Sequence, residues 1–335
     1  MNLPRNSTAW NIGGTKFMRK SASKILDTYG MNLQNPDDDI KRIHIPDDGK
    51  IFVEVDQAGA EVLHVAYLCP PGNKLRELFK YKIKPHTYVA CNIFKNQWEK
   101  EGYPARFFSS IPISEIPKQP QWKAFNQFVK TSDFTNNRYY TGKKTVHSGN
   151  YREGAKTFQK TILTESEGKV FIPLKECERF LFEYREVLVP EIPNFWWPSI
   201  EEQLRRTRTL YNLFGYPITF TATRIDDKLI REATSCVPQS TVGVTTNIAQ
   251  SNAQRRIESD SNFMDVDLLN NKHDSILAQC DIGHEKEVAA MLQSYIEMEF
   301  TSPFGEKYKM GSEVKVGYNW GNYDEQDNPR GLREI

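Results

Sequence analysis

Two aspartates lie where strands are expected to end or turn. Asp56 ends the apolar stretch IFVEVD, and Asp274 lies in the turn of the predicted hairpin NNKHDSILAQC. If both strands belong to one sheet, the carboxylates meet at one edge, where they could hold paired divalent ions about 3.5 to 4 Å apart. Such ions serve phosphoryl transfer. Because aspartate at a strand end is also a common turn former or helix cap, that alternative stays open on residue type alone.

A third stretch, RYYTGKKTVHSGNY, carries a cation, an imidazole and an aromatic ring at four-residue spacing. Lys143, His147 and Tyr151 would lie along one face of a helix. That face could grip a triphosphate at one end and stack a base at the other. The alternative is a solvated helix with a lysine and a half-buried tyrosine.

Composition bounds the class of protein. At 335 residues and 39% hydrophobic, the chain can bury a sizeable core in two or so domains. Lys and Arg total 44 against 43 for Asp and Glu, a net charge of +1, so any nucleic-acid binding needs a local patch. Five cysteines without a CxxC pair argue against a zinc site or disulfide framework. Without a long apolar run or signal peptide, a cytoplasmic protein with no membrane partner is expected.

The elements that would position these residues fall into three regions. A polar, turn-rich segment leads into the strand that ends at Asp56, and mainly helical sequence follows from about residue 70 to 222. Within it, IEEQLRRTRTLYNLFG predicts a helix with Gly215 as its C-cap. Mixed strand and helix then return, which suggests a sheet domain interrupted by a helical insertion.

The last region contains three expected elements. The segment DKLIREATSCVPQSTVGVTTNIAQSNAQRRI predicts a helix broken near Pro238. NNKHDSILAQCDIG predicts two short strands with Ile276, Ala278 and Cys280 on one face. HEKEVAAMLQSYIEMEF predicts an amphipathic helix, and its apolar stripe comprises Val288, Leu292, Tyr295, Ile296 and Phe300.

Taken together, these residues resemble the polymerase portion of family A DNA polymerases, especially the phage-type branch. Three family motifs occur in the right order: an aspartate ending a strand with a glutamate five positions on, a fingers helix, and an HD pair in a hairpin turn. The matching residues are Asp56 and Glu61, then Lys143, His147 and Tyr151, then His273 and Asp274. Supporting matches are GMNLQNP (Gly30 to Pro36), IKPHTYVACNIF, REATSCVPQST and VKVGYNWGN, so the likeness runs from about Gly13 to Asn322.

The resemblance implies an α+β fold in which an antiparallel palm sheet carrying the two aspartates is interrupted by mostly helical fingers. The implied division is palm at 1–72, fingers at 73–222 and palm again at 223–335. The implied activity is template-directed DNA synthesis, with nucleotidyl transfer from a dNTP to a primer 3′-hydroxyl on a primed DNA template.

The resemblance also implies roles for the motif residues. Asp56 and Asp274 would be the catalytic residues and would ligate two Mg²⁺ ions. Lys143 would bind the incoming phosphates as a point charge, while His147 would contact the phosphates or flank the incoming base. Tyr151 would stack near the template base.

Five further residues are assigned by the same resemblance. Glu61 would lie beneath the sugar of the incoming nucleotide and block a 2′-hydroxyl, which favours DNA over RNA synthesis. Arg138 would reach the nucleotide phosphates. His273 would contact the primer terminus, and Arg231 and Gln239 would contact the minor groove or backbone of the new pair.

The chain also departs from the family pattern. The third motif usually reads His-Asp-Glu, whereas Ser275 follows Asp274 here. The usual arginine four residues before the fingers lysine falls on Tyr139, next to Arg138, and the glycine that usually follows the fingers tyrosine is replaced by Arg152.

Only about 50 residues precede the first motif's strand, so we expect the family's thumb and exonuclease domains to be missing from this chain. This predicts a split polymerase whose thumb, and possibly an exonuclease, belongs to a partner chain, or a fragment of a longer protein. Two other classes stay open. One is a single-subunit RNA polymerase-like enzyme, and the other is a non-catalytic accessory subunit on a decayed polymerase fold.

Overall fold

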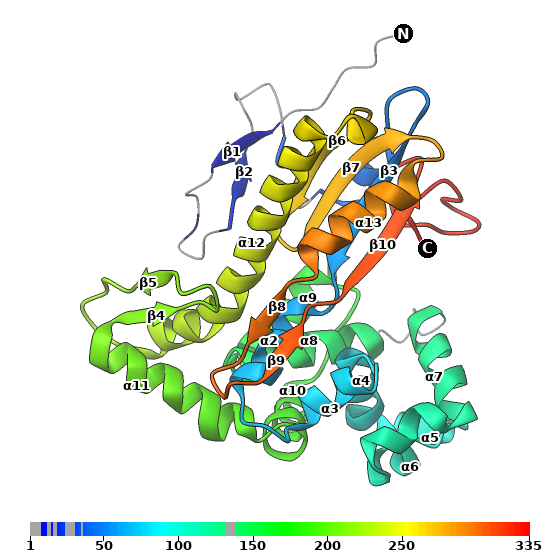
Figure 1. Cartoon of the computed structure of the whole chain (residues 1–335). Helices are drawn as coiled ribbons and strands as arrows, with labels where there is room; N and C mark the ends of the chain where they lie inside the picture. Colours follow the sequence, from blue (N-terminus) through cyan, green and yellow to red (C-terminus); the bar gives the residue numbers. More distant parts are fainter. Residues whose placement is uncertain (1–7, 12–14, 16–18, 24–30, 35, 132–137) are drawn as a thin grey trace.

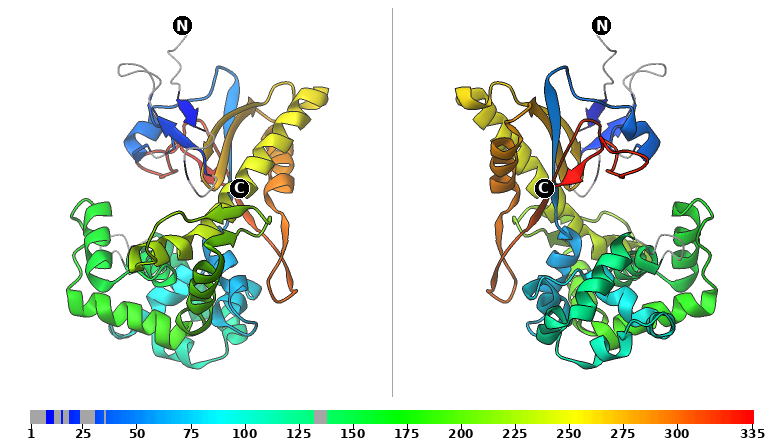
Figure 2. Two further views of the ribbon diagram at one scale, coloured as in Figure 1. Left: turned by 90° about the vertical axis from the view of Figure 1, so that its left-hand side faces the viewer. Right: turned by 90° about the vertical axis from the view of Figure 1, so that its right-hand side faces the viewer.

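The computed structural model describes residues 8–11, 15, 19–23, 31–34, 36–131 and 138–335. Of the stretches that carry the resemblance, Gly13, Gly30 and Asn35 lie outside the described residues. The chain forms two regions, one built on a sheet and one built of helices (Figure 1). Figure 2 shows the sheet and its covering helices at one end of the molecule and the helical region at the other.

A five-stranded antiparallel sheet, in the order β11-β10-β3-β7-β6, is built from both ends of the described chain. The central strand β3 is the predicted strand that carries Asp56, and β6 and β7 form the predicted hairpin. The strands are β3 (Lys50–Gln57), β6 (Asp267–Lys272), β7 (Ser275–Asp281), β10 (Ser312–Gly317) and β11 (Arg333–Glu334). The predicted α+β class is therefore confirmed.

The two faces of this sheet differ because successive side chains of a strand alternate between them. Ile51, Val53 and Val55 of β3 pack in one core cluster with residues of α12 (Asp227–Ser259) and α13 (Glu285–Ile296). The alternate residues Glu54 and Asp56 lie on the opposite face. The apolar alternation thus buries one face under two helices, while the opposite face carries Glu54 and Asp56 beside a small hydrophobic cluster that contains Phe52 and Trp320.

The helical region lies between β3 and α12 in the chain. Its helices are α2 (Ala60–Leu68), α3 (Lys74–Lys80), α4 (Pro85–Ile93), α5 (Lys95–Lys100), α6 (Ala105–Ser110), η1 (Ile113–Lys118), α7 (Pro120–Thr131), α8 (Arg138–Asn150), α9 (Ala155–Glu165), α10 (Leu174–Phe182), η2 (Glu183–Leu188), η3 (Ile192–Trp196) and α11 (Trp197–Thr207). This agrees with the predicted helical insertion, while the boundaries at 72/73 and 222/223 stay predictions.

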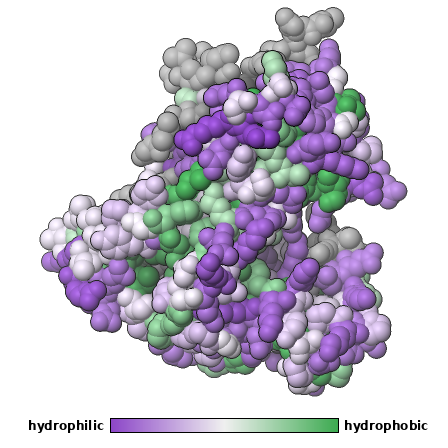
Figure 3. Space-filling model, in the orientation of Figure 1, coloured by the Kyte–Doolittle hydropathy of each residue, from purple (hydrophilic) through white to green (hydrophobic). Residues whose placement is uncertain are grey.

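Short elements complete the described fold. They are the hairpin strands β1 (Ala9–Asn11), β2 (Ser21–Ser23), β4 (Thr209–Tyr211), β5 (Pro217–Thr219), β8 (Glu299–Thr301) and β9 (Lys307–Lys309), with the short helices α1 (Asp38–Arg42) and η4 (Ser261–Phe263). Among the described helices, none combines the length and apolar composition needed to cross a bilayer. In Figure 3, hydrophilic side chains cover most of the face shown, and hydrophobic ones gather near its middle.

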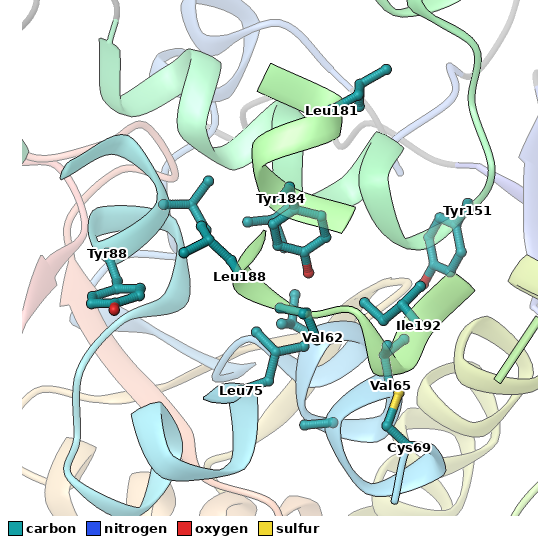
Figure 4. Close-up of a cluster of buried hydrophobic side chains, with 14 of the residues drawn as sticks. Val62, Val65, Cys69, Leu75, Tyr88, Tyr151, Leu181, Tyr184, Leu188 and Ile192 are labelled. Atoms are coloured by element: carbon teal, nitrogen blue, oxygen red, sulfur yellow. The ribbon is translucent and has the colours of Figure 1, made fainter. Parts of the chain in front are cut away.

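Helix α2 links the sheet to the helical core, because it begins three residues after β3 ends. Figure 4 shows Val62 and Val65 of α2 facing Tyr184, Leu188 and Ile192 from the η2 and η3 segment. All five belong to the largest hydrophobic cluster. The segment that follows Asp56 is therefore fixed by a buried core.

The predicted break at Pro238 is wrong, because α12 runs without interruption for 33 residues. Proline inside a helix removes a hydrogen bond and costs about 3 kcal/mol. Burial offsets this cost, since Pro238 is buried and neighbouring residues of α12 belong to three hydrophobic clusters. Tertiary packing overrides the local preference.

Two further element boundaries differ from expectation. The helix predicted to end at Gly215 ends at Thr207, where Arg208 adopts a left-handed φ of 57°, and Gly215 instead lies in the turn between β4 and β5. The predicted stripe of α13 is correct up to Ile296, but Phe300 lies in β8 and packs in a separate cluster.

Burial of His64 in α2 predicts acid sensitivity. The side chain is fully buried, and its Nδ1 atom lies 2.9 Å from the Tyr308 hydroxyl. Burial lowers the pKa of His64 from 6.5 to about 3, so the folded state keeps the ring neutral where the unfolded state binds a proton. The contribution of neutral His64 to the free energy of unfolding is therefore fully present above pH 6.5. It is lost as the pH falls towards 3, at about 1.4 kcal/mol per pH unit.

We expect His64→Asn to remove this dependence. Urea denaturation across the acidic range measures the slope, and His44→Asn, which changes a partly exposed ring, is the control. An unchanged slope in His64→Asn would contradict the assignment.

Candidate active site

Asp56 lies near the end of strand β3, and Asp274 lies in the turn that leads into the adjacent strand β7. Asp56 is paired with Ser275 in the β3–β7 register. The backbone N–H of Gln57 donates to the backbone carbonyl oxygen of Asp274 at 3.0 Å. The structure therefore brings the two predicted aspartates together at one end of β3, as the sequence predicted.

Electrostatics at this edge favour a bound cation. Burial, the charge of Asp274 and the charge of Glu54 raise the pKa of Asp56 well above its usual value. Burial also raises the pKa of Asp274, although Lys272 and Arg19 oppose the shift. Two neighbouring, partly buried carboxylates that disfavour each other's ionisation would gain from a divalent ion between them.

Helix α12 holds both aspartate-bearing segments through Thr246. Its hydroxyl donates to the His273 carbonyl oxygen at 2.8 Å and accepts from the Gln57 side chain at 2.6 Å. His273 takes a φ of 51°, the left-handed conformation that lets the short turn between β6 and β7 close. The turn that presents Asp274 and the strand that presents Asp56 thus share one anchor.

Glu61 joins the first and second motifs. The Tyr151 hydroxyl donates to Glu61 Oε2 at 2.6 Å, and His147 Nε2 lies 3.6 Å from the same oxygen. Arg19 Nη2 is 2.5 Å from Glu61 Oε1. Burial opposes ionisation of Glu61, but the charges of Arg19 and His147 and the hydrogen bond from Tyr151 outweigh it, so its pKa lies below the usual value.

This Glu61 cluster lies close enough to the turn to affect it electrostatically. Arg19 acts on the pKa values of both His273 and Asp274, and burial is the largest cause of the lowered pKa of His273. Arg19 also packs against α12, because a Cβ added at Gly243 would lie 2.8 Å from its side chain. The three motifs therefore meet in one place.

Helix α8 presents the second motif. Lys143 and His147 are exposed, whereas Tyr151, one residue beyond the helix end, is buried. Arg185 fixes this end, since its Nη2 atom donates to the carbonyl oxygens of Ser148 and Glu153, each at 2.8 Å. The structure thus supports the predicted helical face.

Gly149 lets α8 approach the helical core closely. A Cβ at this position would lie 2.2 Å from Cδ1 of Tyr184, a fully buried ring whose hydroxyl donates to Asn150 Oδ1 at 2.7 Å. We expect Gly149→Ala to lower the free energy of unfolding by about 1–3 kcal/mol, because the overpacked ring cannot move away.

Gly154→Ala is the matched control for that substitution. A Cβ at Gly154 meets nothing within 4 Å, and its φ of −77° suits any residue. Urea denaturation of both variants tests the packing, and equal stabilities would contradict it.

The structure does not bring Arg138 into this cluster. Its guanidinium makes a bidentate ion pair with Glu101, with both N–O distances at 2.9 Å, and stacks 3.5 Å from the centroid of Trp98. Its side chain is 5% exposed. In this conformation Arg138 holds the start of α8 to the helical core, so its nucleotide contact would need this pair to open.

Arg231 and Gln239 lie eight residues apart on α12, which places them on one face of the helix. Arg231 is exposed and Gln239 is half-buried. Further along, Asn247 and Gln250 continue the polar side of α12 and line a small pocket with Lys20. This leaves both predicted primer or template residues accessible.

The structure explains how Arg152 can replace the glycine that usually follows the fingers tyrosine in the family pattern. Its φ of 59° is the left-handed conformation that a glycine adopts most easily. Arg152 lies 3.3 Å from a Glu201 oxygen, and its guanidinium lies 5.2 Å from the Trp197 ring centroid. These contacts hold the backbone where the family pattern has glycine.

Sequence reasoning missed four residues of this site. Gln57 and Thr246 form the anchor described above, Arg19 pairs with Glu61, and Glu54 lies beside Asp56. Of these four residues, only Glu54 could have been recognised from the sequence, since a glutamate inside a strongly apolar strand is uncommon. The others depend on contacts between distant segments.

The residues present suit a divalent metal in part. Asp56 Oδ1 is buried and has no hydrogen-bond partner within the described chain. Two neighbouring carboxylates with an unpartnered oxygen match the hard oxygen ligands that Mg²⁺ prefers. Within the same described residues, no group of three or more His, Cys, Asp or Glu side chains is arranged to hold a metal.

Comparisons with known proteins agree with this arrangement at the level of the fold. No protein-family model and no curated protein matches the sequence. Among solved structures, the chain is similar to the POL domain of Pol1 from M. smegmatis in complex with DNA primer-template and dNTP, with a TM-score of 0.64 and 16% identity. The match covers 94% of this chain and 48% of that chain, so this chain spans about half the length of its neighbour. The chain therefore has the α+β fold of a DNA polymerase domain.

Proposed function

We propose that this chain catalyses template-directed DNA synthesis, by transfer of a nucleotidyl group from a dNTP to a primer 3′-hydroxyl. The observation that carries the proposal is the meeting of Asp56, near the end of β3, with Asp274, in the turn before the adjacent strand β7, beside the Glu61, Tyr151 and His147 cluster. The polymerase fold supports it.

Asp56 and Asp274 would hold the divalent metal, proposed to be a pair of Mg²⁺ ions. When bound, the metal lowers the pKa of the primer hydroxyl and neutralises charge on the triphosphate. The protein's own part is to keep the two carboxylates adjacent, which the Thr246 anchor does.

The remaining motif residues would position the substrates. The exposed Lys143 would bind the triphosphate, and His147 would hydrogen-bond it or flank the base. Tyr151 is buried and bonded to Glu61, so it would form one wall of the site for the base pair. His273 would contact the primer terminus. Arg231 and Gln239 would contact the minor groove or backbone of the new base pair.

Glu61 would set the preference for deoxynucleotides. Arg19, Tyr151 and His147 fix its carboxylate from three sides, so it cannot move freely to admit an extra hydroxyl. This rigidity favours DNA over RNA synthesis.

We further propose that the chain is of family A, phage-type, and that a partner chain or a longer parent protein supplies the surface that wraps the duplex. The near-neutral net charge of +1 supports this, because duplex affinity comes mainly from phosphate neutralisation.

Primer extension on a primed DNA template, with Mg²⁺ and either deoxynucleotides or ribonucleotides, tests the function. The proposal expects extension with deoxynucleotides, aided by the partner. Equal use of ribonucleotides would favour an RNA polymerase-like enzyme. No extension, with or without candidate partners, would favour an accessory subunit.

A further inference from the structure

A third carboxylate lies on the catalytic face of the sheet. Glu54 precedes Asp56 by two residues on β3, so both side chains lie on the same face. Glu54 is only 9% exposed, because it lies on the central strand of a five-stranded sheet. Burying a carboxylate there is costly unless an opposite charge compensates it.

No such charge contacts Glu54 within the described residues. Its Oε1 atom accepts from the Ser275 hydroxyl at 3.3 Å and from Trp320 Nε1 at 3.4 Å. Both donors are neutral. Lys315 is its register partner on β10, but the two side chains form no ion pair.

Glu313 provides the contrast, because it is also a neighbour of Asp56. It faces Asp56 in the β3–β10 register, and its Oε1 atom pairs with Lys84 at 2.5 Å. Of the two glutamates that flank Asp56, one is thus neutralised by a lysine and the other is not. The Oδ1 atom of Asp56, which neighbours both glutamates in the sheet, is buried and has no hydrogen-bond partner among the described residues.

We propose that Glu54 is a supporting carboxylate of the divalent-cation site at Asp56 and Asp274, held in place by Ser275 and Trp320. The negative charge of Glu54 strengthens cation binding without Glu54 being a ligand itself. The cation in turn compensates the buried charge of Glu54, which forms no ion pair with a basic residue. The proposal rests on the proposed function, because it assumes that Asp56 and Asp274 bind the metal.

The test measures Mn²⁺ binding to the whole chain without DNA, by the loss of the free-ion signal in electron paramagnetic resonance. Glu54→Gln removes the charge and keeps the shape, and we expect it to raise the Kd about tenfold. Glu313→Gln removes the same charge on the other side of Asp56 and should change the Kd less than about twofold. Circular dichroism checks the fold of each variant.

A rescue variant keeps the test decisive if Glu54→Gln alone folds poorly. Because Ser275 Oγ lies 3.3 Å from Glu54 Oε1, a carboxylate introduced at position 275 restores charge in the same place. Glu54→Gln combined with Ser275→Glu should recover the wild-type Kd. A double variant as weak as Glu54→Gln would overturn the proposal.

Asp274→Asn separates this inference from the proposed function. If Asp274→Asn weakens Mn²⁺ binding while Glu54→Gln behaves like Glu313→Gln, only the role of Glu54 is overturned. If Asp274→Asn leaves Mn²⁺ binding unchanged, or if the wild type binds no Mn²⁺, both the proposed metal site and the proposed role of Glu54 are wrong.

Discussion

Asp274→Asn is expected to reduce the rate of primer extension by about 10³-fold or more, because it removes one of two carboxylates that would hold the catalytic metal. The substitution preserves the size of the side chain and the backbone of the turn, where the Gln57 amide and Thr246 hydroxyl bond to carbonyl oxygens. Single-turnover kinetics at saturating dNTP measure the loss.

The same variant should be at least as stable as the wild type without divalent ions. Burial and the neighbouring carboxylates raise the pKa values of Asp56 and Asp274, so their charged forms destabilise the folded state at neutral pH, and a neutral amide relieves this. Thermal denaturation in a chelator tests the point and separates lost catalysis from misfolding.

Asp265→Asn is the matched control for the catalytic loss. Asp265 is an aspartate close to the same hairpin, but it accepts from the Asp281 amide at 2.9 Å and bonds to His284. It should retain the wild-type rate within about twofold. Equal losses in Asp274→Asn and Asp265→Asn would show that any charge change near the hairpin suffices, and would contradict the assignment.

Lys143→Ala is expected to weaken dNTP use by about tenfold to hundredfold, the range for losing a charged hydrogen bond worth about 1.5–3 kcal/mol. Lys143 is exposed on the face of α8 that also carries His147. The effect should appear in the KM for dNTP, because the lysine would bind the triphosphate before reaction as well as during it.

Lys144→Ala removes the same charge one residue away. Its ammonium pairs with Glu165 and so points to α9. We expect Lys144→Ala to leave the KM for dNTP unchanged, and both variants to bind primer-template equally. If the two lysine variants raise the KM to the same extent, the helix contributes only general positive charge.

Much of the site could be predicted from the sequence because its elements have strong local patterns. The alternating apolar residues of β3 and the two-residue turn at His273 and Asp274 define strands without knowledge of the rest of the chain. The spacing of Lys143, His147 and Tyr151 likewise requires only one helix.

The predictions that failed depend on tertiary contacts. Pro238 continues a helix because surrounding clusters bury it, and Gly215 serves a hairpin turn rather than a helix end. The contacts of Arg138 with Glu101 and Trp98 are also tertiary, and no local pattern indicates them, while its contact with the nucleotide stays a prediction. The links from Arg19 to Glu61 and from Thr246 to the turn join distant segments.

Template-directed synthesis at the Asp56 and Asp274 site is tested most directly by single-nucleotide incorporation opposite each of the four template bases, by the wild type and by Asp274→Asn, with Mg²⁺ and any partner present. We expect the wild type to add only the complementary deoxynucleotide and Asp274→Asn to add almost none. Incorporation that ignores the template base, or that persists undiminished in Asp274→Asn, would contradict it.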